Sequence, residues 1–197
     1  AIFDGWNETA LMAAAEMAGC DADIARLAFP GAKPMDMIEA WIASVDAAME
    51  AEWPAQRLAT LKIRERIRTL VAFRLEAVAH IDEAVRRALA VMAQPQNARR
   101  ALKLGWRSAD IMWRLAGDTA TDYNHYTKRA ILAGIYSATL AVFVNDDSDG
   151  KADTHAFLER RIDGVMKFEK VKAQFLGKDR ELPSLTRFLG RLRYPAR

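Results

Sequence analysis

The three histidines and the carboxylates near them are the residues most suited in type to bind a metal or transfer protons. Glu76 lies four residues before His80, and Glu159 lies four residues after His155, whereas His125 has no such partner. A di-iron site in a helical bundle uses Glu-x-x-His on two helices, and the chain contains no Glu-x-x-His. A lone pair four residues apart is typical of a contact on a helix surface. The sequence therefore predicts no metal site.

Covalent catalysis has equally little support in the sequence. Cys20 is the only cysteine, which excludes an intramolecular disulfide and a cysteine-based zinc or iron–sulfur site. The chain has no Gly-x-Ser-x-Gly motif and no glycine-rich phosphate loop. We therefore expect a protein that is not an enzyme and that carries no cofactor.

Composition and charge restrict the class of protein further. The chain has 197 residues, of which 51% are hydrophobic and 28% are charged, so it can bury a core. The net charge is +3, but residues 1–56 carry 10 acidic and 2 basic side chains, whereas residues 156–197 carry 5 acidic and 11 basic ones. The longest uncharged run in a predicted helix, 130–144, is too short to span a bilayer. We expect an oriented surface and at most peripheral contact with a membrane.

The elements that position these residues are predicted to be helices, because breakers fall at helical intervals and no convincing alternating strand appears. We expect an all-α protein of about nine helices, at residues 7–17, 21–29, 34–53, 56–79, 82–92, 97–116, 122–144, 153–175 and 182–192. The helix 34–53 has an apolar stripe that includes Trp41, Ile42 and Val45. The helix 122–144 is apolar nearly all round, so we expect it to be buried on several sides.

The stretch 106–129 combines aromatic and charged side chains more densely than any other part of the chain. One interpretation is structural: Gly117 ends a helix, and Thr121 or Asp122 caps the next. The other is an exposed patch around Trp113 at which a partner docks, since Trp, Tyr and Arg are common anchors of such sites. The pattern alone leaves both open.

The last predicted helix is basic and amphipathic. Its apolar residues share an arc of roughly 120°, whereas Arg187 and Arg191 point to the opposite face. The apolar residues are Leu182, Leu185, Phe188, Leu189 and Leu192. Such a helix after a polar linker is typical of a membrane-surface anchor, although it could equally dock on its own domain or on a partner.

Several segments together resemble the ubiquinone (coenzyme Q) biosynthesis accessory family. The most specific is Ala-Gly-Asp at 116–118 followed by Thr-Asp-Tyr-Asn-His-Tyr-Thr-Lys-Arg at 121–129; the others are residues 3–6, 25–31, 83–90, 109–115 and 157–162. The resemblance implies a fold like that of the tetracycline-repressor (TetR) transcription factors, lipid binding, and assistance to the di-iron demethoxyubiquinone hydroxylase. It also implies that the first helix of that fold is missing ahead of Phe3.

The same resemblance places residues 21–29 where a repressor has its DNA-reading helix. That segment offers Arg26 against Asp21 and Asp23, within an acidic surrounding. Because DNA binding requires basic side chains at the phosphates, we expect a vestigial helix-turn-helix and no nucleic-acid partner. The alternative is a TetR-like transcriptional regulator with a small apolar ligand.

The resemblance further implies a ligand cavity among the helices after residue 54. The residues available to line it are Leu70, Met92, Met112, Ile131, Ile135, Tyr136 and Phe143, any of which could instead simply pack a core. The implied domains are a helix-turn-helix region at 1–53, a ligand-binding and dimerisation domain at 54–176, and a linker with the tail helix at 177–197. The helices 123–144 and 153–175 match the pair through which repressor-like proteins form homodimers.

The hypothesis is thus a lipid-binding accessory protein. It would bind an isoprenoid quinone or a phospholipid and present isoprenoid quinone intermediates to the hydroxylase. The family motif implies docking at Asp110 and Trp113, to which we add Arg107 and Arg114 from their spacing. The tail would hold the protein at the cytoplasmic face of a bacterial membrane, or at the matrix side of the mitochondrial inner membrane.

Overall fold

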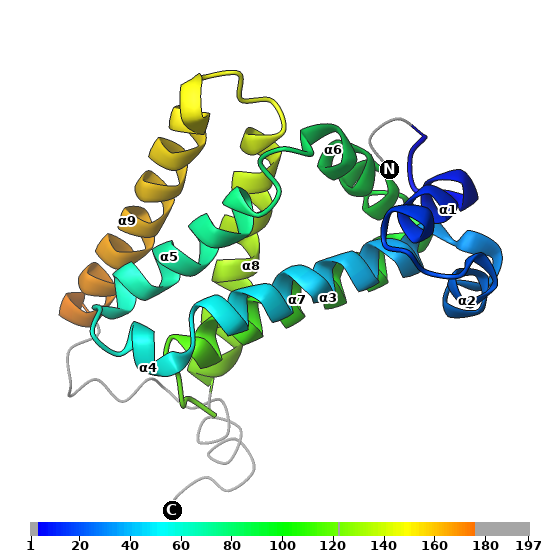
Figure 1. The fold of residues 1–197 in the computed structure, drawn as a ribbon. Helices are drawn as coiled ribbons and strands as arrows, with labels where there is room; N and C mark the ends of the chain where they lie inside the picture. Colours follow the sequence, from blue (N-terminus) through cyan, green and yellow to red (C-terminus); the bar gives the residue numbers. More distant parts are fainter. Residues whose placement is uncertain (1–3, 122, 176–197) are drawn as a thin grey trace, which may run out of the picture. The chain divides into compact units, whose positions relative to one another are not determined.

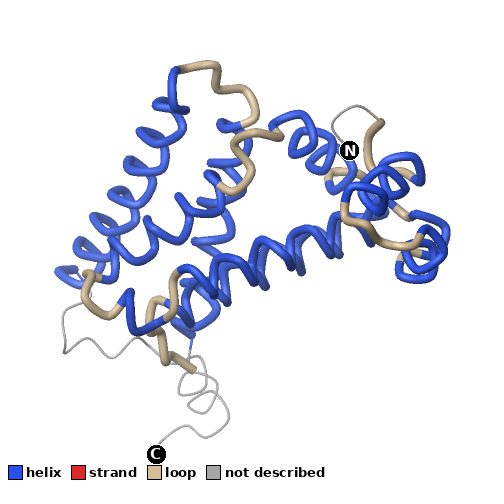
Figure 2. Tube along the Cα trace, viewed as in Figure 1, coloured by secondary structure: helices blue, strands red, loops and turns tan. Residues whose placement is uncertain are grey.

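A computed structural model describes residues 4–121 and 123–175, and within them it contains nine α-helices and no strand (Figures 1 and 2). The helices are α1 (Glu8–Met17), α2 (Ala22–Ala28), α3 (Pro34–Glu52), α4 (Ala55–Leu58), α5 (Ile63–Glu76), α6 (Asp82–Met92), α7 (Ala98–Leu115), α8 (Tyr123–Phe143) and α9 (Ala152–Phe175). The chain divides into two compact units, 1–160 and 161–197. The packing described below is that of the first unit.

Side-chain caps explain where the first two helices begin. The Asn7 side chain accepts a hydrogen bond from the backbone N–H of Ala10, and the Asp21 carboxylate accepts one from the N–H of Asp23. These contacts satisfy donors that the first turn of a helix leaves free. Between the two helices Gly19 has a φ of +63°, which permits the sharp turn. Their apolar faces meet in a small cluster of Leu11, Ala15 and Ala25 together with Met37 of α3.

The predicted single helix 56–79 is wrong, because the structure has two helices there, α4 and α5. The Arg66 guanidinium donates hydrogen bonds to the carbonyls of Ala59 and Leu61, which lie in the turn between them. The next helix begins after Lys62, whose N–H donates a hydrogen bond to the Glu65 carboxylate at 3.1 Å. The break therefore persists because Arg66 satisfies carbonyls that a continuous helix would have bonded internally.

α8 is less enclosed than its composition suggested. Leu132, Thr139 and Phe143 are buried, but Gly134 and Ser137 are exposed within this chain. The exposed positions of α8 from residue 130 onwards are all small: Ala130, Gly134, Ser137 and Ala141. At 100° per residue they form one narrow stripe, so the expectation of burial on several sides is corrected to burial on one.

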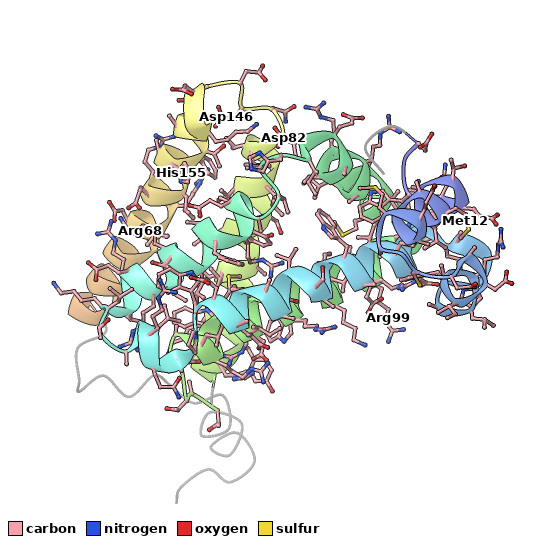
Figure 3. All side chains as sticks on the ribbon, viewed as in Figure 1. Met12, Arg68, Asp82, Arg99, Asp146 and His155 are labelled. Atoms are coloured by element: carbon pink, nitrogen blue, oxygen red, sulfur yellow. The ribbon has the colours of Figure 1, made fainter. Side chains whose placement is uncertain are left out.

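The connection between α8 and α9 is organised around the buried Asp146. Its carboxylate accepts hydrogen bonds from the N–H and hydroxyl of Ser148 and from the N–H and hydroxyl of Thr154. Bonds from Ser148 and Thr154 hold the pKa of Asp146 well below the ordinary range of a carboxyl group. Lys151 extends the network, since its ammonium group pairs with Asp82 at the start of α6. Figure 3 shows Asp82 and Asp146 at the same end of these helices.

Within the part of the chain that the structure describes, no helix is both long and apolar enough to cross a bilayer. The predicted tail helix 182–192, with its proposed membrane-contacting residues, lies outside the described residues.

Candidate functional site

A mainly apolar cavity of about 290 Å³, partly open to the outside, lies among α3, α5, α6, α7 and α8. The apolar lining comes from Trp41, Ile42, Val45, Val78, Val85, Leu89, Met92, Ala93, Ala101, Leu104, Gly105 and Leu140. Gly105 of α7 is also a lining residue, and a Cβ added there would meet no other atom within 4 Å, so there is free space next to this position. The volume is at the lower end of the range for small-molecule sites, roughly 300–1,000 Å³.

A buried polar group adjoins this apolar space. Arg74 of α5 and Ser108 of α7 line the cavity, and both contact Asp46 of α3, which is buried. The guanidinium pairs with the carboxylate, and the Ser108 hydroxyl donates to the same carboxylate at 3.2 Å. The ring of Tyr136, another lining residue, is centred 4.9 Å from the Arg74 Cζ. The cavity wall thus combines apolar surface with an internally paired charge.

The Arg74 side chain is protonated in spite of its burial. Burial alone lowers the pKa of Arg74, but the neighbouring Tyr136 and Asp46 raise it more, and the net pKa shift is upward. Arg74 therefore stays positively charged, although only 2% of its side chain is exposed.

Of the seven residues predicted to line a lipid cavity, two line the cavity in the structure and five do not. Met92 and Tyr136 line it. Leu70 and Met112 are fully buried in the helical core, and Phe143 borders a separate hollow beside Lys151. Ile131 and Ile135 are half-buried positions of α8 that are not part of the lining.

Apart from Met92 and Tyr136, the lining residues were missed from sequence, and two groups among them differ in the signal that the sequence offered. The first is Trp41, Ile42 and Val45 of α3, which the apolar stripe of that helix could have indicated. The second is Arg74 with Ser108, for which no local signal exists, because a charged residue in an amphipathic helix normally indicates the solvent face.

The four predicted docking residues lie on the second half of α7, next to the start of α8. Asp110 pairs with Arg129 at 2.5 Å and with Arg114 at 3.1 Å, whereas Arg107 is exposed. Trp113 is half-buried, and its indole N–H donates to the Lys128 carbonyl at 2.9 Å. Asp110 and Trp113 are therefore held in place by α8, and Arg107 and Arg114 flank them at the surface.

A second carboxylate completes this network. Asp118 pairs with Lys128 at 2.6 Å and with the buried Arg129 at 3.0 Å. Burial raises the pKa of Asp118, but hydrogen bonds from Lys128 and Arg129 lower it more, so the net pKa shift is downward. Beside the network the residue Tyr126 is 61% exposed, and its ring centroid lies 6.1 Å from that of Trp106. Asp118 and Arg129 therefore have a structural role in this stretch, whereas Arg107, Arg114 and Tyr126 are exposed at its surface.

The helix-turn-helix region offers little positive charge to a partner. Arg26 of α2 pairs with Glu8 at 3.3 Å and with Asp23 at 3.1 Å. Among the residues that the structure describes, no group of three or more His, Cys, Asp or Glu side chains could hold a metal ion.

These helices define an all-α protein with a TetR-like fold. The solved TetR transcriptional regulator from Nitrosomonas europaea ATCC 19718 is similar with a TM-score of 0.63, over 79% of this chain and 85% of that one. The sequence identity is 22%, so this likeness concerns the fold alone. The predicted all-α, TetR-like architecture is confirmed.

The sequence relatives are more specific. Residues 98–169 match the COQ9 family model. The chain is 32% identical over 169 residues to the mitochondrial ubiquinone biosynthesis protein COQ9 of Rattus norvegicus, covering 82% of this chain and 54% of that protein. It is 40% identical over 100 residues to the human COQ9 protein, covering 51% of this chain and 31% of that protein. These matches and the fold support the COQ9 family of ubiquinone biosynthesis for this chain, as the sequence resemblance predicted. The matched part spans about half the length of the rat protein and less of the human one.

Proposed function

We propose that this chain is a lipid-binding accessory protein that presents isoprenoid quinone intermediates to the demethoxyubiquinone hydroxylase. The observation that carries the proposal is the apolar cavity among α3 and α5 to α8. Met92 in its wall is a side chain that adapts to flexible apolar ligands. Because the volume is small, a ring and the first part of a tail would fill the cavity, and a longer tail would leave through its opening. The proposed role is binding and presentation, without a catalytic step of its own.

Mass spectrometry of the freshly purified protein and of its organic extract tests this role. We expect an isoprenoid quinone or a phospholipid at close to one molecule per protomer. Gly105→Leu should reduce the retained lipid, because the new side chain would enter the cavity. Lys103→Leu, which adds the same side chain at an exposed position of α7, should retain it. An empty wild-type protein would contradict the proposal.

The hydroxylase is proposed to dock on the surface at Arg107, Asp110, Trp113 and Arg114. Support comes from the geometry, because Asp110 and Trp113 are fixed by contacts with α8 while still partly accessible. A preorganised aromatic side chain flanked by charges is a common form of binding hot spot.

A pull-down of the hydroxylase tests the docking surface. Trp113→Ala should abolish capture while the far-UV circular dichroism stays unchanged. Leu102→Ala removes another apolar side chain of α7, one that is 77% exposed and two turns or more from Trp113, and should leave capture intact. Equal capture by all three proteins would refute the assignment.

Attachment to a membrane surface is proposed for the basic tail. The support is the amphipathic pattern of 182–192, since anionic lipids attract basic residues near their surface by roughly 1 kcal/mol each. A chain ending at Lys178 should float less with anionic liposomes than the full chain does. Equal flotation would show that the tail is not the anchor.

A further inference from the structure

Arg74 has a hydrogen-bond donor with no partner. Its Nη1 pairs with Asp46, but its Nε is buried and has no hydrogen-bond acceptor among the described residues. Buried polar groups in native proteins are nearly always bonded, and Arg74 also forms part of the cavity wall, so a ligand bound in the cavity is in a position to supply the missing partner. The partner must be an acceptor, because a guanidinium has no lone pair to offer.

The charge balance at this place selects an uncharged acceptor. Arg74 and Asp46 compensate one another, and the Ser108 hydroxyl adds a donor to the same carboxylate. An anionic ligand would leave one uncompensated negative charge in an apolar surrounding, which is strongly unfavourable. A carbonyl, ether or phenol oxygen would accept the hydrogen bond without changing the net charge.

The neighbouring side chains favour a flat head group. The Tyr136 ring lies against the Arg74 guanidinium, and Trp41 lines the same cavity. Aromatic walls pack well against a planar ring, and the aliphatic lining suits a hydrocarbon chain. The polar group is supplied by three helices, α3, α5 and α7, so it is positioned by packing and not by one flexible segment.

We propose that Arg74, held by Asp46, donates a hydrogen bond from Nε to an uncharged oxygen on the ring of the bound lipid. Arg74 is then the residue that selects an oxygenated ring over a plain hydrocarbon or a charged lipid. This inference rests on the proposed lipid-binding function and names the chemistry of the ligand's head.

Three probes with alkyl chains of nine or ten carbons separate the possibilities: decyl-1,4-benzoquinone, decylbenzene and decanoate. Their affinities are measured by displacement of the uncharged fluorophore N-phenyl-1-naphthylamine from the full chain. In the wild-type protein we expect the quinone to bind about tenfold more tightly than decylbenzene or decanoate, the gain typical of one hydrogen bond that satisfies a buried donor.

The double variant Arg74→Met/Asp46→Asn removes both charges together, so that neither is left unpaired. It should bind the quinone and decylbenzene equally, with the affinity for decylbenzene unchanged. Arg68→Met is the matched control, because Arg68 lies on the same helix but is paired with Glu159 at the surface. That variant should keep the tenfold preference.

A measurement on the wild-type protein does not depend on the variant folding. The Nε–H signal of Arg74 in a 15N-correlated NMR spectrum, assigned by its loss in Arg74→Lys, should shift with the quinone and not with decylbenzene. An unshifted signal, an equal affinity of the wild-type protein for quinone and decylbenzene, or a preference for decanoate would overturn the assignment of Arg74. Failure of the fluorophore and all three probes to bind would instead refute the lipid cavity itself, and with it this inference.

Discussion

At the scale of single residues, two buried carboxylates are held as anions by different partners. The Asp146 carboxylate accepts hydrogen bonds from uncharged groups of Ser148 and Thr154, whereas Asp118 is paired with Lys128 and Arg129. Both pKa values lie below the ordinary range. A carboxyl group whose pKa is lower in the folded state than in the unfolded state stabilises the fold above its unfolded pKa, and that stabilisation is lost as the pH falls.

The free energy of unfolding should therefore decrease as the pH falls below about 4, the unfolded pKa of an aspartate. Asp146→Asn should lower it at pH 7 by about 1–3 kcal/mol, because the amide NH₂ would face donors where a carboxylate oxygen had accepted. The decrease with falling pH should also become shallower in this variant. Urea unfolding at pH 7 and pH 3 measures both effects, with Asp147→Asn, an exposed neighbour, as the control. An Asp146→Asn protein as stable as the wild type would refute the role of this network.

At the scale of the elements, the end of α7 shows how a helix terminus is joined to distant parts of the chain. The N–H of Asp118 donates a hydrogen bond to the Trp113 carbonyl at 2.9 Å, and Gly117 has a φ of +89°. Arg66 donates to the Ala116 carbonyl at 2.8 Å, so the helix end is also bonded to α5. The predicted helix end at Gly117 is thus both a local glycine cap and a tertiary contact.

Gly117→Ala should reduce the free energy of unfolding by about 1–2 kcal/mol, since the left-handed conformation is unfavourable for an L-residue. In addition, the new Cβ would lie 3.1 Å from Nη1 of Arg66. Gly105→Ala on the same helix is the matched substitution. It has an ordinary helical conformation and free space, so it should be neutral or stabilise by about 0.5–1 kcal/mol. The two variants are compared by denaturant midpoint, and equal midpoints would contradict this view of the cap.

At the scale of the whole molecule, we propose that the small-residue stripe on α8 lies in the homodimer interface that the family resemblance implies. Small side chains allow the backbones of two helices to approach closely. An interface of this kind between identical chains is expected to be symmetric.

Light scattering should give a dimer for the wild-type protein at micromolar concentration. Gly134→Arg should shift it to a monomer, because the long charged side chain would lie within the stripe. Ala47→Arg, at an exposed position of α3, should leave the mass unchanged. A monomeric wild-type protein would refute the dimer.

The charge of the region around α2 distinguishes a lipid carrier from a regulator of transcription. Arg26 is the only basic residue of α2 and is paired with two carboxylates, in a region that is strongly acidic. Fluorescence anisotropy with random-sequence duplex DNA at about 50 mM salt should show no binding, because a DNA-binding protein gains most of its non-specific affinity from phosphate contacts. Tight binding that weakens as salt is added would favour the alternative of a transcriptional regulator.

The helical class and most helix ends could be predicted from the amino-acid sequence, because these depend on local chemistry. Asn7 and Asp21 cap helices, Pro34 begins one, and Gly117 ends one, each through contacts within a few residues. The family resemblance was likewise readable, since it rests on contiguous motifs such as the one at 121–129.

The break between α4 and α5 and the lining of the cavity depend on contacts between residues far apart in the chain, so they are seen only in the folded protein. The break depends on Arg66, whose guanidinium donates hydrogen bonds to the Leu61 carbonyl in the turn before α5 and to the Ala116 carbonyl at the end of α7. The polar group depends on Asp46, Arg74 and Ser108, which are separated by 28 residues or more and are brought together by helix packing. Local patterns carry no information about such contacts, because a buried arginine and an exposed one have the same surroundings in the sequence.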